Sequence, residues 1–204
     1  MANVGVRRAR RADIDAVARI QMHAWRADYR QFVPAAVLAE LTGADAAEVW
    51  RRRWAEAVTA PPSPRHHLLV AVADEAVVGF AACGPADEAD HDADTTAELI
   101  TLGVDPGHAA DGHDSRLLAA VADVLRDEGF RTVIAWVFEA DEERRAFFVS
   151  AGWAPDGARR TLTFPTPSDP TPSGGSAGGA AAPAPLTMVR LHTDIGPADE
   201  PGPR

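Results

Sequence analysis

Hydrophobic residues recur at helical spacing near the start of the chain. Apolar side chains at steps of three and four over residues 14–25 predict a helix with one apolar face, and the stretch Val4–Ala9 before it predicts a strand. Asp13 lies between the two and is expected to accept hydrogen bonds from the first free N–H groups of the helix. Two further helices are predicted near residues 34–41 and 45–58.

The rest of the chain alternates strands with helices. Short β-type runs bounded by turn residues predict strands, and longer runs with apolar residues three and four apart predict helices. In chain order these elements are strands 68–73, 77–82 and 98–104, helix 114–126, strand 132–138, helix 142–150, and strands 159–164 and 186–193. Asp114 is the expected N-cap of the helix that it begins. This order of elements is typical of an α+β fold.

A segment rich in proline, glycine and alanine separates the last two predicted strands. Residues 165–185 contain six Pro and four Gly, a composition that favours a disordered insertion over a packed element. We therefore expect a single domain over residues 4–195, interrupted by this insertion and followed by a disordered tail at 196–204.

The composition, with 46% hydrophobic and 25% charged residues, fits a soluble globular protein. No apolar run approaches the roughly 18 residues that a membrane span needs, so no membrane association is expected. The single cysteine, Cys83, excludes a disulfide framework and indicates a cytoplasmic location. All 20 basic residues are arginine, which excludes mechanisms based on a lysine Schiff base or a Walker-type phosphate loop.

The net charge of −10 is concentrated in one segment. Residues 66–115 contain eleven acidic residues and no arginine, so the rest of the chain sums to about +1. A surface of this sign repels nucleic-acid phosphates and suits a cationic or amine-bearing partner. We therefore expect no nucleic-acid partner. A solvated acidic loop at residues 86–98 is the other interpretation of this charge.

Several phrases of the sequence together resemble the GNAT superfamily of N-acetyltransferases. They stand in the family's order and read AELITLGVDP, SRLLAAVADVL and AWVFEADEERRAFFVSAGWAPDG. The resemblance spans roughly residues 4–164 and 186–195. It implies a GNAT-like α+β fold, in which about four helices flank a mixed, mostly antiparallel sheet of about seven strands.

The resemblance also implies where acetyl-CoA would bind as the co-substrate. In the family the strand that corresponds to residues 98–104 diverges from its neighbour, and its backbone pairs with the pantetheine arm. The following loop and helix start hold the pyrophosphate, because free N–H groups and the helix dipole favour an anion. The residues that this assigns to the cofactor are Leu102, Gly103, Val104, Gly112, Ser115, Arg116, Asp141, Arg145 and Phe148.

The loop before helix 114–126 departs from the family pattern. Where the family has a basic residue and three glycines, this chain has Ala109, Ala110, Asp111, Gly112 and Asp114. Two carboxylates near a pyrophosphate, together with a missing charge-assisted hydrogen bond, would weaken cofactor binding by orders of magnitude. Compensation is expected from nearby arginines, namely Arg116, Arg144 and Arg145.

A second departure removes a proton donor. Many relatives place a tyrosine that protonates the departing thiolate where this chain has Phe148, which has no proton to give. Glu98 corresponds to a general base of some relatives, and a partly buried carboxylate suits that role; a strand end facing solvent is the alternative. Trp25 and Tyr29, in a phrase that resembles one bacterial branch, form either the acceptor pocket or ordinary helix packing.

No metal site is expected. His108, Asp111, His113 and Asp114 carry metal-binding groups, but they lie in one short loop without a second anchoring element.

Two functions therefore remain open. The first is an acetyl-CoA-dependent N-acyltransferase that acetylates a small amine by direct attack, with Glu98 as the base. The second is a catalytically inactive binding or regulatory module of the same fold that has lost acetyl-CoA binding. A homodimer or a protein partner is the expected setting for such a module.

Overall fold

The computed structural model describes residues 4–163 and 185–196. Seven strands form one sheet in the order β1-β2-β3-β4-β5-β7-β6, and every neighbouring pair is antiparallel except β4 and β5. The strands are β1 (Val4–Arg8), β2 (His67–Ala73), β3 (Ala76–Pro85), β4 (Thr96–Val104), β5 (Thr132–Phe138), β6 (Ala154–Leu162) and β7 (Leu186–Asp194). The predicted α+β class and strand number are confirmed. The expected insertion and tail, apart from Pro185 and Gly196, lie outside the described residues.

Five α-helices flank the sheet in the described part of the chain, one for each predicted helical segment, whereas the resemblance implied about four. They are α1 (Ile14–Asp28), α2 (Ala35–Thr42), α3 (Ala44–Thr59), α4 (His113–Asp127) and α5 (Glu142–Ser150). Gly43 separates α2 from α3. A Cβ at Gly43 would lie 2.8 Å from the carbonyl oxygen of Ala39, so this tight connection requires glycine.

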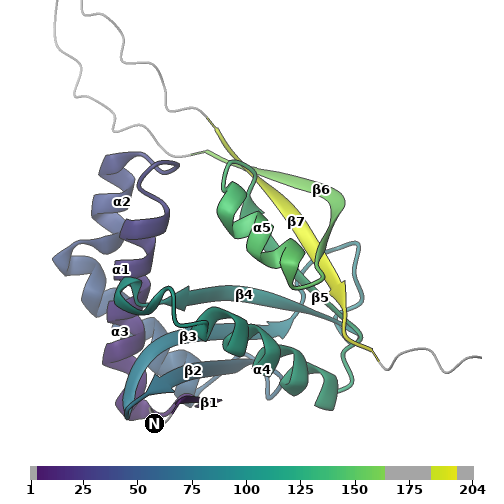
Figure 1. The fold of residues 1–204 in the computed structure, drawn as a ribbon, viewed down its shortest axis with the longest axis horizontal. Coiled ribbons are helices and arrows are strands. Elements are labelled where there is room, and N and C mark those ends of the chain that lie inside the picture. Colours follow the sequence, from purple (N-terminus) through teal and green to yellow (C-terminus); the bar gives the residue numbers. More distant parts are fainter. Residues whose placement is uncertain (1–3, 164–184, 197–204) are drawn as a thin grey trace, which may run out of the picture.

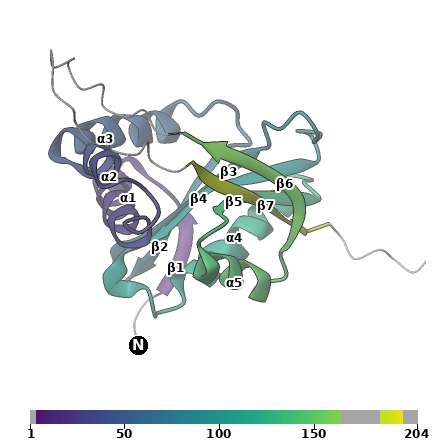
Figure 2. The ribbon, with the colours of Figure 1, turned by 90° about the horizontal axis from the view of Figure 1, so that it is seen from above.

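The helices cover opposite faces of the sheet (Figures 1 and 2). Successive strand residues point to opposite faces. In β2, Val70 packs with Val17 of α1 and Trp54 of α3, whereas the preceding Leu69 belongs to the core that includes Leu117 of α4. Both faces of the central strands are therefore buried, which explains their almost continuous hydrophobic sequences.

The sheet divides where β4 and β5 separate. Their parallel pairing extends over three residue pairs, from Thr96–Thr132 to Glu98–Ile134. Beyond Glu98, no described strand pairs with the β5-facing edge of β4, and the halves β1–β4 and β5–β7 diverge (Figure 1). A small apolar cluster connects α1 and α2 to β5 and β7 across this gap, and its buried members are Val33, Leu38, Phe138 and Leu186.

Two expected helix caps are wrong. The carboxylate of Asp13 accepts hydrogen bonds from Arg7 at 2.7 and 2.8 Å and from the backbone N–H of Arg10 at 2.6 Å, and it does not cap α1. The Arg7 guanidinium holds the pKa of Asp13 below its usual range. Asp114 lies inside the first turn of α4, whose N-cap is Gly112 in the left-handed conformation at φ 69°.

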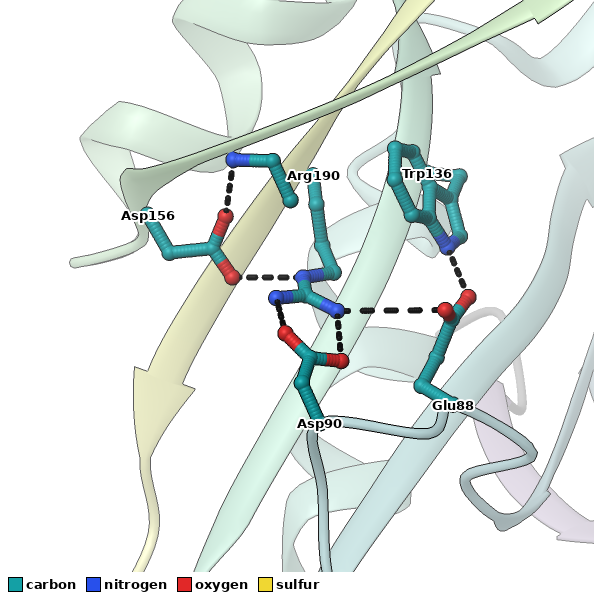
Figure 3. Close-up of polar contacts among 6 residues, drawn as sticks. Glu88, Asp90, Trp136, Asp156 and Arg190 are labelled. Atoms are coloured by element: carbon teal, nitrogen blue, oxygen red, sulfur yellow. Dashed lines mark hydrogen bonds and ion pairs between the residues drawn. The ribbon is translucent and has the colours of Figure 1, made fainter.

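A buried arginine ties the acidic loop between β3 and β4 to the far half of the sheet (Figure 3). Arg190 of β7 is 5% exposed, donates to both carboxylate oxygens of Asp90, and places Nε 2.5 Å from a carboxylate oxygen of Asp156. Glu88 lies 3.9 Å from the same guanidinium and accepts a hydrogen bond of 2.7 Å from the indole of Trp136. Part of the acidic loop is thus bound to the fold instead of being fully solvated.

Replacing Arg190 by methionine is expected to lower the free energy of unfolding by about 2–3 kcal/mol, because Asp156 and Glu88 then face a partly buried site without their cation. Denaturant unfolding at neutral pH measures this change. The control Arg159→Met removes an exposed ion pair with Glu139 and should cost less than about 1 kcal/mol. Equal losses in the two variants would contradict the role of Arg190.

The difference between wild type and Arg190→Met should shrink in acid. The hydrogen bond from Arg190 lowers the pKa of Asp90 to about 2. A carboxylate whose pKa is depressed in the folded state stabilises the protein above its unfolded pKa of about 3.9, and this contribution disappears as pH falls through the folded value. Unfolding measured at about pH 5 and about pH 2 should therefore show a smaller difference at the lower pH.

Candidate active site

A cavity of about 310 Å³ lies where β4 and β5 diverge. We call it the aromatic cavity, because seven aromatic side chains from α1, α3, α5 and β5 line it: Trp25, Tyr29, Trp50, Trp54, Trp136, Phe138 and Phe148. Five further residues of β4 contribute to its wall, Glu98 among them. The structure thus brings Glu98, Trp25, Tyr29, Leu102, Asp141 and Phe148, all selected from the sequence, into one wall.

Glu98 is the last residue of β4 that pairs with β5. Its side chain is half-buried, and this burial raises the pKa of the carboxyl group above its usual value. Arg160 opposes the shift, whereas the negative charges of Glu88 and Asp87 add to it. A carboxylate with a raised pKa is a better proton acceptor than an ordinary surface glutamate, and this one faces a cavity.

The two aromatic residues of α1 both line the cavity and pack against other rings. Trp25 meets Trp50 edge to face at 5.1 Å, and Tyr29 meets Phe138 in the same way at 4.9 Å. Burial raises the pKa of the Tyr29 phenol. Trp25 and Tyr29 therefore have both of the expected roles, because their packing against neighbouring rings holds them in the cavity wall.

Arg144 crosses the gap between the two halves of the sheet. Its guanidinium donates a hydrogen bond to the carbonyl oxygen of Leu102, on the edge of β4 that has no strand partner. Leu102 thus uses the backbone group that a bound extended chain would need. Gly103 packs against Phe80, and a Cβ at this position would lie 3.0 Å from the ring.

A second cavity of about 420 Å³ adjoins the first, at the N-terminal ends of α4 and α5. We call it the acidic cavity, because its lining includes four carboxylates and two arginines: Asp28, Asp114, Asp141, Glu143, Arg30 and Arg144. Burial raises the pKa of Asp28; the charges of Asp141 and Glu143 add to the shift, and Arg144 opposes it. Val104 and Ala109 also line this cavity, so the loop that departs from the family pattern does face it.

The expected phosphate contacts are not preformed. Arg116 donates to the backbone carbonyl of Asp111 at 2.6 Å, and Arg145 donates to the carbonyl of Glu139 at 3.1 Å. Together with Arg144, all three candidate arginines bind backbone oxygens. Ser115 lines a separate groove between α4 and α5 and does not join the other assigned residues.

Several residues of the site were missed in the sequence. Arg144 was considered only as a phosphate ligand, and Asp28, Trp136 and Arg160 were not singled out. Arg160 lies 4.4 Å from the centroid of the Trp136 ring and completes the wall beside Glu98. The alternation of β5 places Trp136 on one face, but only the strand order shows that this face borders the gap.

The loop before α4 brings together three of the four metal-binding side chains from which no metal site is expected on sequence grounds. His108, Asp111 and His113 each offer a ligand atom, and these atoms lie within 4.8 Å of one another. Asp114 is not part of this group, because its carboxylate accepts a hydrogen bond from the N–H of Ser115 at 2.8 Å.

Among the helices that the structure describes, none is long and apolar enough to cross a membrane.

Known proteins share this architecture. The chain is 26% identical over 136 residues to an uncharacterized N-acetyltransferase of Bacillus subtilis, YuaI, covering 67% of this chain and 72% of that protein. The PaiA N-acetyltransferase of Thermoplasma acidophilum, solved with coenzyme A, superposes with a TM-score of 0.68 at 12% identity, covering 94% and 99% of the two chains. YncA of Salmonella typhimurium, solved with acetyl-CoA, gives 0.62 at 19% identity over 98% of each chain.

Membership follows from the sequence as well as from the architecture. The model of the acetyltransferase (GNAT) family matches residues 21–153, which is more than half of the chain and includes the second half of α1 and all of β4, α4 and α5. The chain therefore belongs to the acetyltransferase (GNAT) family.

Proposed function

We propose that this protein transfers an acetyl group from acetyl-CoA to a small amine. The observation that carries the proposal is the position of Glu98, half-buried in the aromatic cavity at the point where β4 leaves β5. Family membership supports acyl transfer, and the complexes of PaiA with coenzyme A and of YncA with acetyl-CoA support the co-substrate.

In this proposal the chain's own residues bind and orient the cofactor and deprotonate the acceptor amine. The free edge of β4, from Leu102 to Val104, holds the extended arm of the cofactor through backbone hydrogen bonds. Glu98 accepts a proton from the ammonium group of the acceptor, and the free amine then attacks the thioester carbonyl. A backbone N–H stabilises the developing oxyanion. Phe148 carries no hydroxyl, so the thiolate leaves without a proton from this position.

The aromatic cavity favours a compact amine. Its volume of about 310 Å³ suits a small acceptor, and its rings attract an ammonium group through their faces. Glu98 supplies the negative charge that draws the same group inward. The acidic surroundings from Asp87 and Glu88 reinforce that attraction.

Arg144 has two effects on the cofactor, and their magnitudes differ. Its bond to Leu102 competes with the cofactor for one backbone carbonyl, an interaction worth about 0.5–1.5 kcal/mol net. As a cation beside four carboxylates, it also offers a phosphate a charge-assisted bond of about 1.5–3 kcal/mol. The second effect is larger, so we expect Arg144 to leave Leu102 and bind phosphate when the cofactor enters.

The acidic cavity favours a second candidate function, an inactive binding or regulatory module. Four carboxylates line the place where a pyrophosphate would lie, and Phe148 lacks the acidic hydroxyl. Calorimetric titration with acetyl-CoA separates the two functions. Binding at micromolar concentration supports the transferase. No binding at millimolar concentration supports the inactive module, whose homodimer or protein partner would then be sought.

Glu98→Gln is expected to lower kcat about 10²–10⁴-fold while leaving acetyl-CoA binding nearly unchanged, because it removes the base without altering the shape of the strand. In the wild type, activity should fall as pH drops through the raised pKa of Glu98, since the protonated carboxyl cannot accept a proton. Steady-state rates between about pH 5 and about pH 9 test both statements.

The matched control for this test is Asp87→Asn. Asp87 raises the pKa of Glu98 from outside the cavity lining, so its neutralisation should preserve kcat and move the acid limb of the profile to lower pH. An unchanged kcat in Glu98→Gln would show that Glu98 is not the base.

Ala109→Arg combined with Asp114→Asn is expected to tighten acetyl-CoA binding at least tenfold. The change adds a charge-assisted bond of about 1.5–3 kcal/mol and removes one repulsive carboxylate from the acidic cavity. Calorimetry at two salt concentrations measures the effect. The control Asp123→Asn with Asp127→Asn makes the same change in net charge at the other end of α4 and should leave the affinity within about threefold. An equal gain in acetyl-CoA affinity in both double variants would show that the effect comes from net charge and not from the loop.

A further inference from the structure

The loop between β4 and α4 gathers two imidazoles and one carboxylate. The carboxylate oxygen Oδ2 of Asp111 lies 3.1 Å from Nδ1 of His108 and 3.9 Å from Nε2 of His113. The rings of the two histidines meet edge to face with their centroids 5.9 Å apart. This group lies outside both cavities described above, although Ala109 and Asp114, which line the acidic cavity, are its neighbours in the chain.

His113 is unusual among these three residues because it is buried and has no hydrogen bond. Its side chain is 2% exposed, and in the described part of the chain Nδ1 has no hydrogen-bond partner. Nε2 faces the Asp111 carboxylate at 3.9 Å, which is too long for a direct hydrogen bond. Leaving the buried Nδ1 unpaired costs about 1–3 kcal/mol, and Nε2 is the ring nitrogen that faces the carboxylate and can bind a ligand.

We propose that His108, Asp111 and His113 bind a divalent transition-metal ion, with zinc as the best match. Imidazole nitrogens and a carboxylate oxygen are ordinary zinc ligands. In a tetrahedral site with bonds of about 2.0–2.1 Å, neighbouring donor atoms lie about 3.3 Å apart. The two distances to Asp111 are 3.1 and 3.9 Å and all three ligand atoms lie within 4.8 Å of one another, so the site needs at most about 1.5 Å of closure.

Three protein ligands leave one coordination position open for water or another oxygen. The charged side chains around His113 are one arginine and two carboxylates, a surplus of one negative charge that favours a cation. Arg116 donates to the backbone oxygen of Asp111 and repels a cation, while the carboxylates of Asp111 and Asp114 attract it. Arg116 also holds the loop to α4, which fixes the position of Asp111 before an ion arrives.

The ion would supply a charge that the loop lacks. The position of Ala109, basic in relatives, borders the acidic cavity between His108 and Asp111. A divalent ion there offsets the carboxylates of Asp111 and Asp114, and its open position accepts a phosphate oxygen. This coupling to acetyl-CoA rests on the proposed function, whereas metal binding itself does not.

The test of the site is a zinc titration of the untagged protein after removal of metal by a chelator. Competition with a chromophoric chelator should show one equivalent bound at micromolar concentration or tighter. His108→Ala and Asp111→Asn should each weaken binding at least tenfold, and both residues are exposed enough for the variants to fold. The control His23→Ala changes an exposed histidine outside the group and should bind zinc like the wild type.

Cobalt binding provides a second readout of the site that leaves His113 unchanged, because replacement of this buried residue endangers folding. A tetrahedral cobalt complex gives strong visible absorption, and this band should be lost in His108→Ala but kept in His23→Ala. No zinc binding at millimolar concentration, or equal binding in His108→Ala and the wild type, would overturn the site.

Acetyl-CoA titrations with and without zinc test the coupling. Zinc should raise the affinity of the wild type for acetyl-CoA at least tenfold and that of His108→Ala not at all, and acetyl-CoA should tighten zinc by the same factor. Equal acetyl-CoA affinity with and without zinc would overturn the coupling and leave the site supported. Absence of acetyl-CoA binding in both conditions would overturn the proposed function as well as the coupling, while the zinc titration still decides the site.

Discussion

The short parallel contact between β4 and β5 is the constraint on which the rest of the structure depends. Three residue pairs join the two halves of the sheet, and beyond Glu98 the strands separate. That separation leaves the backbone edge of β4 without a strand partner, opens the aromatic cavity, and places Glu98 in its lining. On the face covered by α4 and α5, one core cluster contains residues of both halves, so side-chain packing joins the halves where strand pairing is missing.

Carboxylates are neutralised in one region of the molecule and left in excess in another. Around Arg190, carboxylates from the acidic loop and from β6 are neutralised by one buried guanidinium and become part of the fold. In the acidic cavity, carboxylates outnumber arginines and keep a surplus of negative charge. The same acidic composition thus stabilises one region and leaves another poorly suited to an anion, unless Arg144 or a bound cation changes the balance.

Strands, helices and the family could be predicted from the sequence because hydrophobic spacing and short motifs are local properties. The hydrogen-bond partners of individual side chains could not be predicted in this way. Asp13 has the chemistry of a helix cap, yet its carboxylate binds Arg7, six positions earlier in β1, and the backbone N–H of Arg10. Arg144 reaches Leu102 across 42 positions, a contact that exists only once the strand order is known. Glu98 was selected through the resemblance, and its burial in a cavity is visible only in three dimensions.

The aromatic cavity takes its wall from both halves of the sheet, and three residue pairs join these halves. Ala97 and Ile134, within this contact, are fully buried and touch neither cavity. A bulkier residue at either position would change the angle between β1–β4 and β5–β7, and with it the width of the aromatic cavity. Selection for a different acceptor can therefore act on the buried contact between β4 and β5, without changing any side chain that faces the acceptor.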